Sequence, residues 1–148
     1  MQSLLRFQKR NNKMIPELGH FTLILALAVA LVQAVIPGMG LLLRRTDWMA
    51  VAKPACLLQF VLVLTAYGIL TYSFIVHDFS VLYVANTSNS ELPLIYRISG
   101  VWGAHEGSLL LWLLILSGWT AILGIVSKNY PVDMVAGVIS VLGFISIG

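Results

Sequence analysis

The sequence predicts an all-α integral membrane protein, a polytopic bundle of transmembrane helices with about four helices present. Of its 148 residues, 59% are hydrophobic and only 10% are charged, whereas a soluble domain carries about 25% charged residues. Its mean hydropathy is +0.91. Four apolar stretches reach or approach the roughly 20 residues that a helix needs to cross the hydrocarbon core. These observations place the chain in the membrane class before any motif is considered.

The charge and the cysteine content exclude two classes of function. The net charge of +3 comes with no basic patch interleaved with aromatic residues, so we expect no nucleic-acid partner. Cys56 is the only cysteine, so it can form neither an internal disulfide nor a CxxC redox pair. Because it lies inside an apolar run, we expect it to be a small buried hydrophobic residue.

Apolar stretches and the polar residues between them divide the chain into successive segments. These are a basic extension at residues 1–13, a first transmembrane helix at 14–43, a basic cytoplasmic loop at 44–53, a second helix at 54–76, an outer loop at 77–101, a third helix at 102–126, a short loop at 127–131 and the start of a fourth helix at 132–148. The last stretch is still apolar at Gly148, with no polar or basic flank, so we interpret the chain as truncated in its fourth helix.

Prolines shape the first two helices. In residues 14–43, Pro37 and two glycines lie in the last third, so we expect the straight part of that helix to end near Ile36. In residues 54–76, Pro54 stands in the first helical turn, where its missing N–H costs nothing.

The first 13 residues, MQSLLRFQKRNNK, have two open interpretations. The apolar run after them is too long for a secretory signal peptide, and no small-residue cleavage site closes it. They resemble a basic arm on the membrane surface, since apolar and basic residues alternate. The second interpretation is that these residues are a misassigned start, because Met14 opens an alternative beginning of the same protein.

The choice of start decides the predicted topology. Counted from Met14, four basic residues of the connecting segments fall on one side of the membrane and only Arg97 on the other. Because Lys and Arg favour the cytoplasmic side in short loops, we predict that residues 44–53 are cytoplasmic. The N-terminus and residues 77–101 then lie on the outer side. With the extension included, the difference between the two sides nearly vanishes.

The outer loop is unusually apolar for a connection. Its front half is β-branched and aromatic, its middle, NTSNS, is a turn cluster, and its rear, LPLIYRISG, is amphipathic. We expect it to cover the membrane surface or neighbouring helices. The alternative is a floor or lid for a site at the outer leaflet.

The stretch VWGAHEGSLLLW, at the start of the third helix, places a histidine and a glutamate in an otherwise apolar segment. Near a helix N-terminus Glu106 is favoured by the helix dipole, and Trp102 suits the headgroup level. At the bilayer centre the pair would be far more costly, so we expect His105 and Glu106 at the membrane boundary. Gly103 and Gly107 have the GxxxG spacing, which lets another helix approach closely.

His105, Trp112 and Trp119 are spaced by seven residues, so they share one stripe of the helix. Ser108 lies beside that stripe. Three interpretations stay open: the stripe packs on other helices, with His105 and Glu106 as satisfied polar groups; it borders a site for a flat ligand such as haem or quinone; or the ionisable pair relays protons, as in transporters.

Two stretches carry a family resemblance: MIPELGHFTLILALAVALVQ, from Met14, and DFSVLYVANTSNSELPLIYRISGVWGAHEGSLLLW, from Asp78 to Trp112. They resemble the N-terminal region of the CcmF/NrfE family, the haem lyase subunits of bacterial cytochrome c maturation (System I). Family members typically begin at the position of Met14. The resemblance therefore supports a misassigned start, and with it the outward N-terminus.

The resemblance implies a protein several times longer than this chain, in the bacterial inner membrane, with a periplasmic N-terminus and 77–101 loop. Such proteins help to attach haem to the CxxCH motif of apocytochrome c on the outer face. Implied partners are apocytochrome c, other Ccm or Nrf assembly subunits, a periplasmic haem chaperone and membrane lipid. The implied cofactor is haem b, with ligands downstream of this region. His20, His77 and His105 match none of those ligands.

The same resemblance limits what we expect of this chain. We assign no catalytic residue and no metal ligand to it. The candidates for a place near a haem site are the signature residues Trp102, Gly103, His105, Glu106, Gly107, Ser108 and Trp112. We expect His105 and Glu106 to hold an interhelical hydrogen-bond network beneath that site. The alternatives are a haem or small-molecule transporter or channel subunit without lyase activity, or a structural subunit of a membrane complex.

Overall fold

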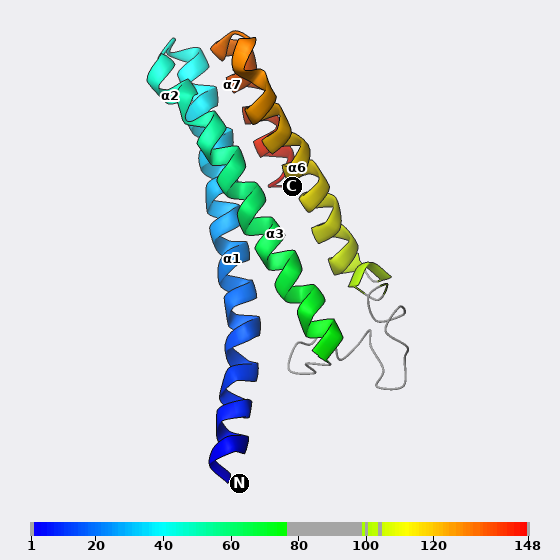
Figure 1. Ribbon diagram of the computed structural model, residues 1–148. Helices are drawn as coiled ribbons and strands as arrows, with labels where there is room; N and C mark the ends of the chain where they lie inside the picture. The colour runs from blue at the N-terminus through cyan, green and yellow to red at the C-terminus, as the bar shows by residue number, and fades with distance from the viewer. Residues whose placement is uncertain (1, 77–98, 100, 104, 148) are drawn as a thin grey trace. The chain divides into compact units, whose positions relative to one another are not determined.

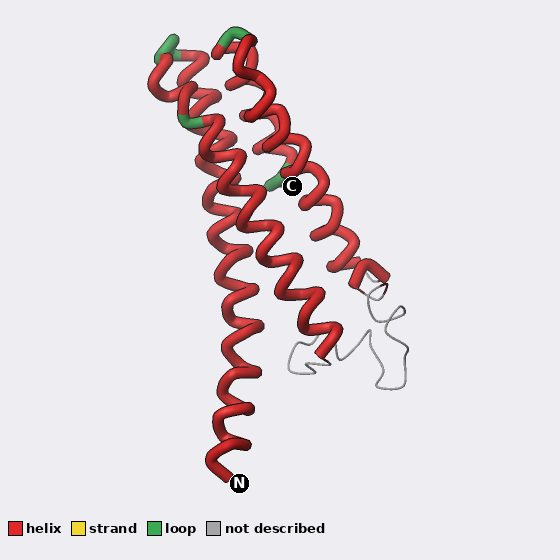
Figure 2. Tube along the Cα trace, in the orientation of Figure 1, coloured by secondary structure: helices red, strands yellow, loops and turns green. Residues whose placement is uncertain are grey.

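The computed structural model of the chain describes residues 2–76, 99, 101–103 and 105–147 (Figure 1). Within these residues the secondary structure is helical, without a strand (Figure 2). The helices are α1 (Gln2–Leu42), α2 (Thr46–Ala50), α3 (Ala52–Val76), α6 (His105–Val126), the 3₁₀ helix η1 (Ser127–Asn129) and α7 (Val132–Ile145). The predicted all-α fold is confirmed.

Three helical segments of the described chain are long and apolar enough to cross a membrane: Glu17–Leu42, Thr46–Ile75 and His105–Asn129. A shorter apolar helix, Val132–Ile145, follows them. The chain groups into two compact units, one of Met1–Thr22 with Thr65–Trp112 and one of Leu23–Leu64 with Leu113–Gly148. We call these the first and the second unit and describe each by itself.

Several boundaries differ from those drawn on the sequence. The basic extension is continuous with α1, and the helix passes Ile36 and Pro37 to end at Leu42. Proline removes one backbone hydrogen bond, but leaving the helix in lipid would expose several unpaired backbone groups, so the helix continues. The basic segment at 44–53 contains α2, and α7 ends at Ile145.

A Schellman-type turn ends α1. The Arg45 N–H donates to the Gly40 carbonyl at 2.8 Å and the Arg44 N–H to the Leu41 carbonyl at 3.3 Å, which is the paired 6→1 and 5→2 pattern of this motif. Arg44 has a φ of 52°. It thus occupies the left-handed position that glycine usually takes.

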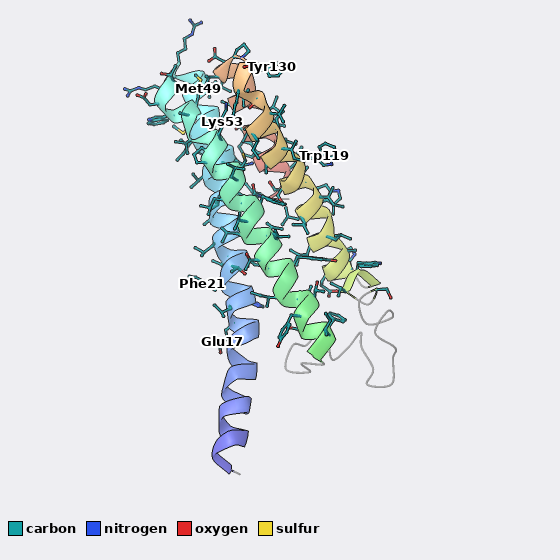
Figure 3. All side chains as sticks on the ribbon, in the orientation of Figure 1. Glu17, Phe21, Met49, Lys53, Trp119 and Tyr130 are labelled. Carbon is teal, nitrogen blue, oxygen red and sulfur yellow. The ribbon has the colours of Figure 1, made fainter. Side chains whose placement is uncertain are left out.

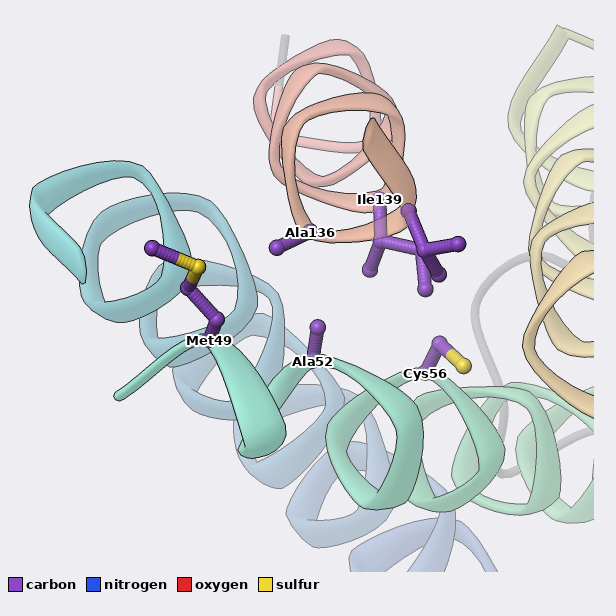
Figure 4. Close-up of a cluster of buried hydrophobic side chains, with 6 residues drawn as sticks. Met49, Ala52, Cys56, Ala136 and Ile139 are labelled. Atoms are coloured by element: carbon purple, nitrogen blue, oxygen red, sulfur yellow. The ribbon is translucent and has the colours of Figure 1, made fainter. Parts of the chain in front are cut away.

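The core of the second unit joins α2, α3 and α7 (Figure 4). It is built from the buried side chains of Met49, Ala52, Cys56, Val135, Ala136 and Ile139. The expectation for Cys56 is confirmed, since it is fully buried among apolar neighbours.

Small residues bring α1 and α7 close together in this unit. A Cβ on Gly143 would lie 3.0 Å from the backbone nitrogen of Ala34. The Ser140 hydroxyl donates to the Ala34 carbonyl, and Gln33 Nε2 donates to the Ile139 carbonyl at 3.2 Å. Because lipid tails are as apolar as leucine, close packing and interhelical hydrogen bonds hold membrane helices together.

Candidate functional site

The VWGAHEGSLLLW motif is anchored at its first residue. In the first unit, Val101 is fully buried and forms a cluster with Phe74 near the end of α3, with Tyr67 and Leu70 packed against it. Residues 101–103 are helical, Ala104 lies outside the described residues, and α6 begins at His105. The start of α6 is therefore held against α3 in the first unit.

Glu106 lies in the first turn of α6, as the motif predicts. The partial positive charge of a helix N-terminus favours a carboxylate at this position. The Ser108 hydroxyl does not meet that carboxylate. It donates to the His105 carbonyl one turn back, at 2.8 Å, which is a local side-chain bond to the helix backbone.

The polar side chains of the motif are exposed. His105, Glu106 and Ser108 lie on the surface of the described chain, and no described residue forms a hydrogen bond or ion pair with the side chain of His105 or Glu106. An imidazole and a carboxylate together offer both a donor and acceptors. Neither group is used within the part of the chain that the structure describes.

The two glycines of the GxxxG pair differ. A Cβ on Gly103 would meet no atom within 4 Å, whereas Gly107 is buried. The close helix contact that the spacing predicts is therefore not formed at Gly103 by any described residue. It stays a prediction about neighbours outside the described residues.

An exposed tryptophan face continues along α6. Trp112 is 51% exposed and Trp119 is 67% exposed, and Trp119 points away from the other helices of the second unit (Figure 3). Trp102, before α6, is 47% exposed. The residues of the predicted stripe thus lie on the exposed side of the helix.

The other face of α6 is buried in the second unit. A Cβ on Gly118 would lie 3.4 Å from the Phe60 ring, and one on Gly124 would lie 2.6 Å from the Cys56 sulfur. Ser117 and Thr120 are buried on this side. α6 therefore has one face fixed by packing within the chain and one face left open.

Sequence reasoning missed a set of buried polar side chains in the second unit. They are Gln33, Gln59, Ser117, Thr120, Ser127 and Ser140. Gln33 Oε1 has no hydrogen-bond partner among the described residues. The available signal was a glutamine within each of two apolar stretches, since uncharged polar groups at membrane depth usually face the bundle interior.

The described residues contain no group of three or more His, Cys, Asp or Glu side chains placed to hold a metal ion. His77 and nearly all of the predicted outer loop at 77–101 lie outside them. The expectation that this loop covers the membrane surface therefore stays a prediction.

Three curated relatives show which proteins the chain is similar to, although no family model matches it. It is 54% identical over 135 residues to the cytochrome c-type biogenesis protein CcmF of Pseudomonas aeruginosa. That alignment covers 91% of this chain and 20% of the relative. It is 44% identical to CcmF of Escherichia coli and 38% identical to NrfE of Haemophilus influenzae. Each of these two alignments covers 91% of this chain and 21% of the relative.

A solved structure agrees with the sequence comparisons. The cytochrome c haem lyase CcmF matches with a TM-score of 0.84 and 28% identity, over 90% of this chain and 22% of that one. Over about nine tenths of its length, this chain is similar in sequence and in fold to CcmF and NrfE proteins. It spans about a fifth of the length of the curated relatives it matches.

The similarity to CcmF and NrfE proteins confirms the resemblance read from the sequence. Together with the apolar helices, it identifies a multi-pass membrane protein. The relatives' names connect the family to cytochrome c biogenesis and to haem. They assign no role to an individual side chain of this chain.

Proposed function

We propose that this chain is part of a membrane haem lyase subunit that helps to attach haem covalently to the CxxCH motif of apocytochrome c. The observation that carries the proposal is the agreement of sequence and fold with one family over nine tenths of the chain. In this proposal haem b is the cofactor. The partners are apocytochrome c, a periplasmic haem chaperone and other assembly subunits.

The exposed motif is the part of the chain best suited to such a site. His105 and Glu106 stand at a helix start and offer hydrogen-bonding groups that no described residue uses. In this proposal they complete an interhelical hydrogen-bond network beneath the haem site, with neighbours beyond the described residues. They position that site and are not its haem ligands.

The proposal includes an orientation. Arg44, Arg45 and Lys53 lie at one end of the helix pair α1 and α3, and α6 begins after the connection from the other end of α3. Since basic residues favour the cytoplasmic side, we place the arginines in the cytoplasm. The start of α6 then lies on the periplasmic side of the inner membrane.

Deletion and complementation test the function. A strain lacking the complete gene is expected to lose covalently bound haem from its c-type cytochromes and to regain it with the intact gene. Haem staining of denatured periplasmic protein measures this directly. Normal covalent haem in the deletion strain, with altered movement of haem across the membrane, would replace the lyase proposal with the transporter alternative.

A further inference from the structure

An apolar groove runs between α1 and α3 in the second unit. Its volume is about 340 Å³, and its lining consists of aliphatic side chains and a proline. Leu25 and Val32 on α1 line the groove. Val51, directly before α3, and Leu58, within α3, line its other side. Seven residues separate each of these pairs, so the groove is about 10 Å long at 1.5 Å per residue.

The rim of the groove is open to the surroundings. Leu25 is 38% exposed, Val32 is 40% exposed and Leu58 is 51% exposed. The lining offers no hydrogen-bonding side chain, so a polar ligand would lose its hydrogen bonds with water and gain none in return. Its shape and chemistry fit a hydrocarbon chain.

Basic side chains gather where the groove approaches the end of the helices. Arg44 and Arg45 are exposed, and Lys53 directly precedes Pro54, which lines the groove. Lys53 Nζ also donates to the Ser127 carbonyl at 3.3 Å, which brings the connection between α6 and α7 to this end of the unit. Trp48 in α2 is 37% exposed, as suits an aromatic side chain at headgroup level.

The charge at this end is positive overall. Three further charged side chains are exposed: Lys128 in η1, Asp133 in the first turn of α7 and Asp47 in α2. With the two arginines and Lys53, there are four basic side chains against two acidic ones. Clusters of this kind beside transmembrane helices attract anionic lipid headgroups.

Arg44 adds an independent observation. Its φ of 52° lies in the left-handed region, where a side chain is disfavoured and glycine is the usual choice. A glycine would end α1 at lower cost. An arginine in this place suggests that its guanidinium has a use that outweighs the backbone strain.

We propose that this groove binds one anionic phospholipid, with an acyl chain between α1 and α3 and the phosphate at Arg44 and Arg45. The five residues of α2 (Thr46–Ala50) separate Arg45 from Val51, and they rise about 8 Å. An arginine side chain and a glycerol phosphate together can span that distance. A second copy of the chain or another helix could cover the groove, but neither would account for the arginine at the left-handed position.

The test uses the whole membrane protein, purified and placed in phosphatidylcholine nanodiscs with increasing phosphatidylglycerol. Native mass spectrometry counts the phosphatidylglycerol molecules retained. Because a basic residue near an anionic surface contributes about 1 kcal/mol, Arg44→Gly should weaken retention about fivefold. The melting temperature of the Arg44→Gly variant in pure phosphatidylcholine should equal or exceed that of the wild type, because glycine relieves the backbone strain at this left-handed position.

Two matched controls make the test specific. Lys128→Gln removes a charge at the same end without touching the groove, and it should change retention less than Arg44→Gly does. Ala28→Phe fills the groove and should abolish the retained lipid, whereas Leu27→Phe, at a neighbouring exposed position outside the lining, should not.

Three results would overturn the proposal. Unchanged retention in Arg44→Gly would show that the arginine has no lipid partner. Equal losses in Arg44→Gly and Lys128→Gln would show general surface attraction without a site. Loss of assembly or cytochrome c yield in Ala28→Phe with lipid retention intact would identify a protein segment as the occupant. Lipid retention and assembly do not depend on the proposed lyase function, so the two proposals fail separately.

Discussion

The interior of the second unit and the start of α6 use similar residues in opposite ways. In the interior, Gly143 lies against the backbone of Ala34, and Ser140 donates a hydrogen bond across the same helix pair. At the start of α6, Gly103 has open space and Glu106 has no partner among the described residues. The interior is explained by contacts within this chain. The exposed side chains of His105 and Glu106 have no such explanation, which points to a role toward neighbours beyond the described residues.

Gly143→Ala should have the largest effect on stability. The added methyl group would meet backbone atoms of Ala34 at 3.0 and 3.2 Å, which cannot move aside as a flexible side chain can. Overpacking of this kind costs about 1–3 kcal/mol. Thermal unfolding of the whole protein in detergent measures the loss.

Gly68→Ala is the matched control, because a Cβ there would meet nothing within 4 Å. It lies within α3, so it should be neutral or stabilising by up to about 1 kcal/mol through helix propensity. Equal destabilisation by the two substitutions would contradict the account of the α1–α7 contact.

Trp119→Ala tests the exposed face of α6. If a protein neighbour covers this tryptophan, its removal should lower the yield of cytochrome c by about fivefold or more, which corresponds to about 1 kcal/mol. The level of the protein should be unchanged, because Trp119 is 67% exposed within this chain.

Ile125→Ala, at a position 54% exposed on the same helix, is the comparison for Trp119→Ala. It is expected to leave the yield of cytochrome c close to that of the wild type. If Trp119→Ala also leaves the yield unchanged, the face contacts lipid only.

Ser140→Ala should have the smallest effect. It removes the hydrogen bond to the Ala34 carbonyl, and such interhelical bonds contribute about 0.6 kcal/mol on average in membrane proteins. The same unfolding measurement should resolve a small loss of stability. A loss as large as that of Gly143→Ala would mean that the hydroxyl, and not the close approach of the backbones, dominates the contact.

Apolar length sufficed to predict the helices, because a span must satisfy its own backbone in lipid. Apolar length missed α2, because the charges of Arg44, Arg45 and Asp47 resemble those of a loop. Asp47 nevertheless lies in the short helix Thr46–Ala50. The place of Glu106 in a first helical turn followed from its position ahead of an apolar run.

Burial could not be predicted in the same way. Gly103 and Gly124 are both glycines near or within one helix, yet only Gly124 is packed against another side chain, the Cys56 sulfur. That difference depends on which residues of α3 lie opposite, and a single sequence does not reveal it. For the same reason the buried Gln33 was overlooked, and the exposure of His105 became visible only in the structure.

The central proposal is that the exposed side chains of His105 and Glu106 serve haem attachment and not the packing of this chain. It is tested by His105→Ala and Glu106→Ala in the whole protein, with covalently bound haem in c-type cytochromes measured per unit of the protein present. His20→Ala and Glu17→Ala are matched controls, since they remove the same exposed residue types from α1. We predict a loss of covalent haem at normal protein level for the α6 pair and none for the α1 pair. Full covalent haem in both α6 variants, or a loss that only follows a fall in protein level, would contradict the claim.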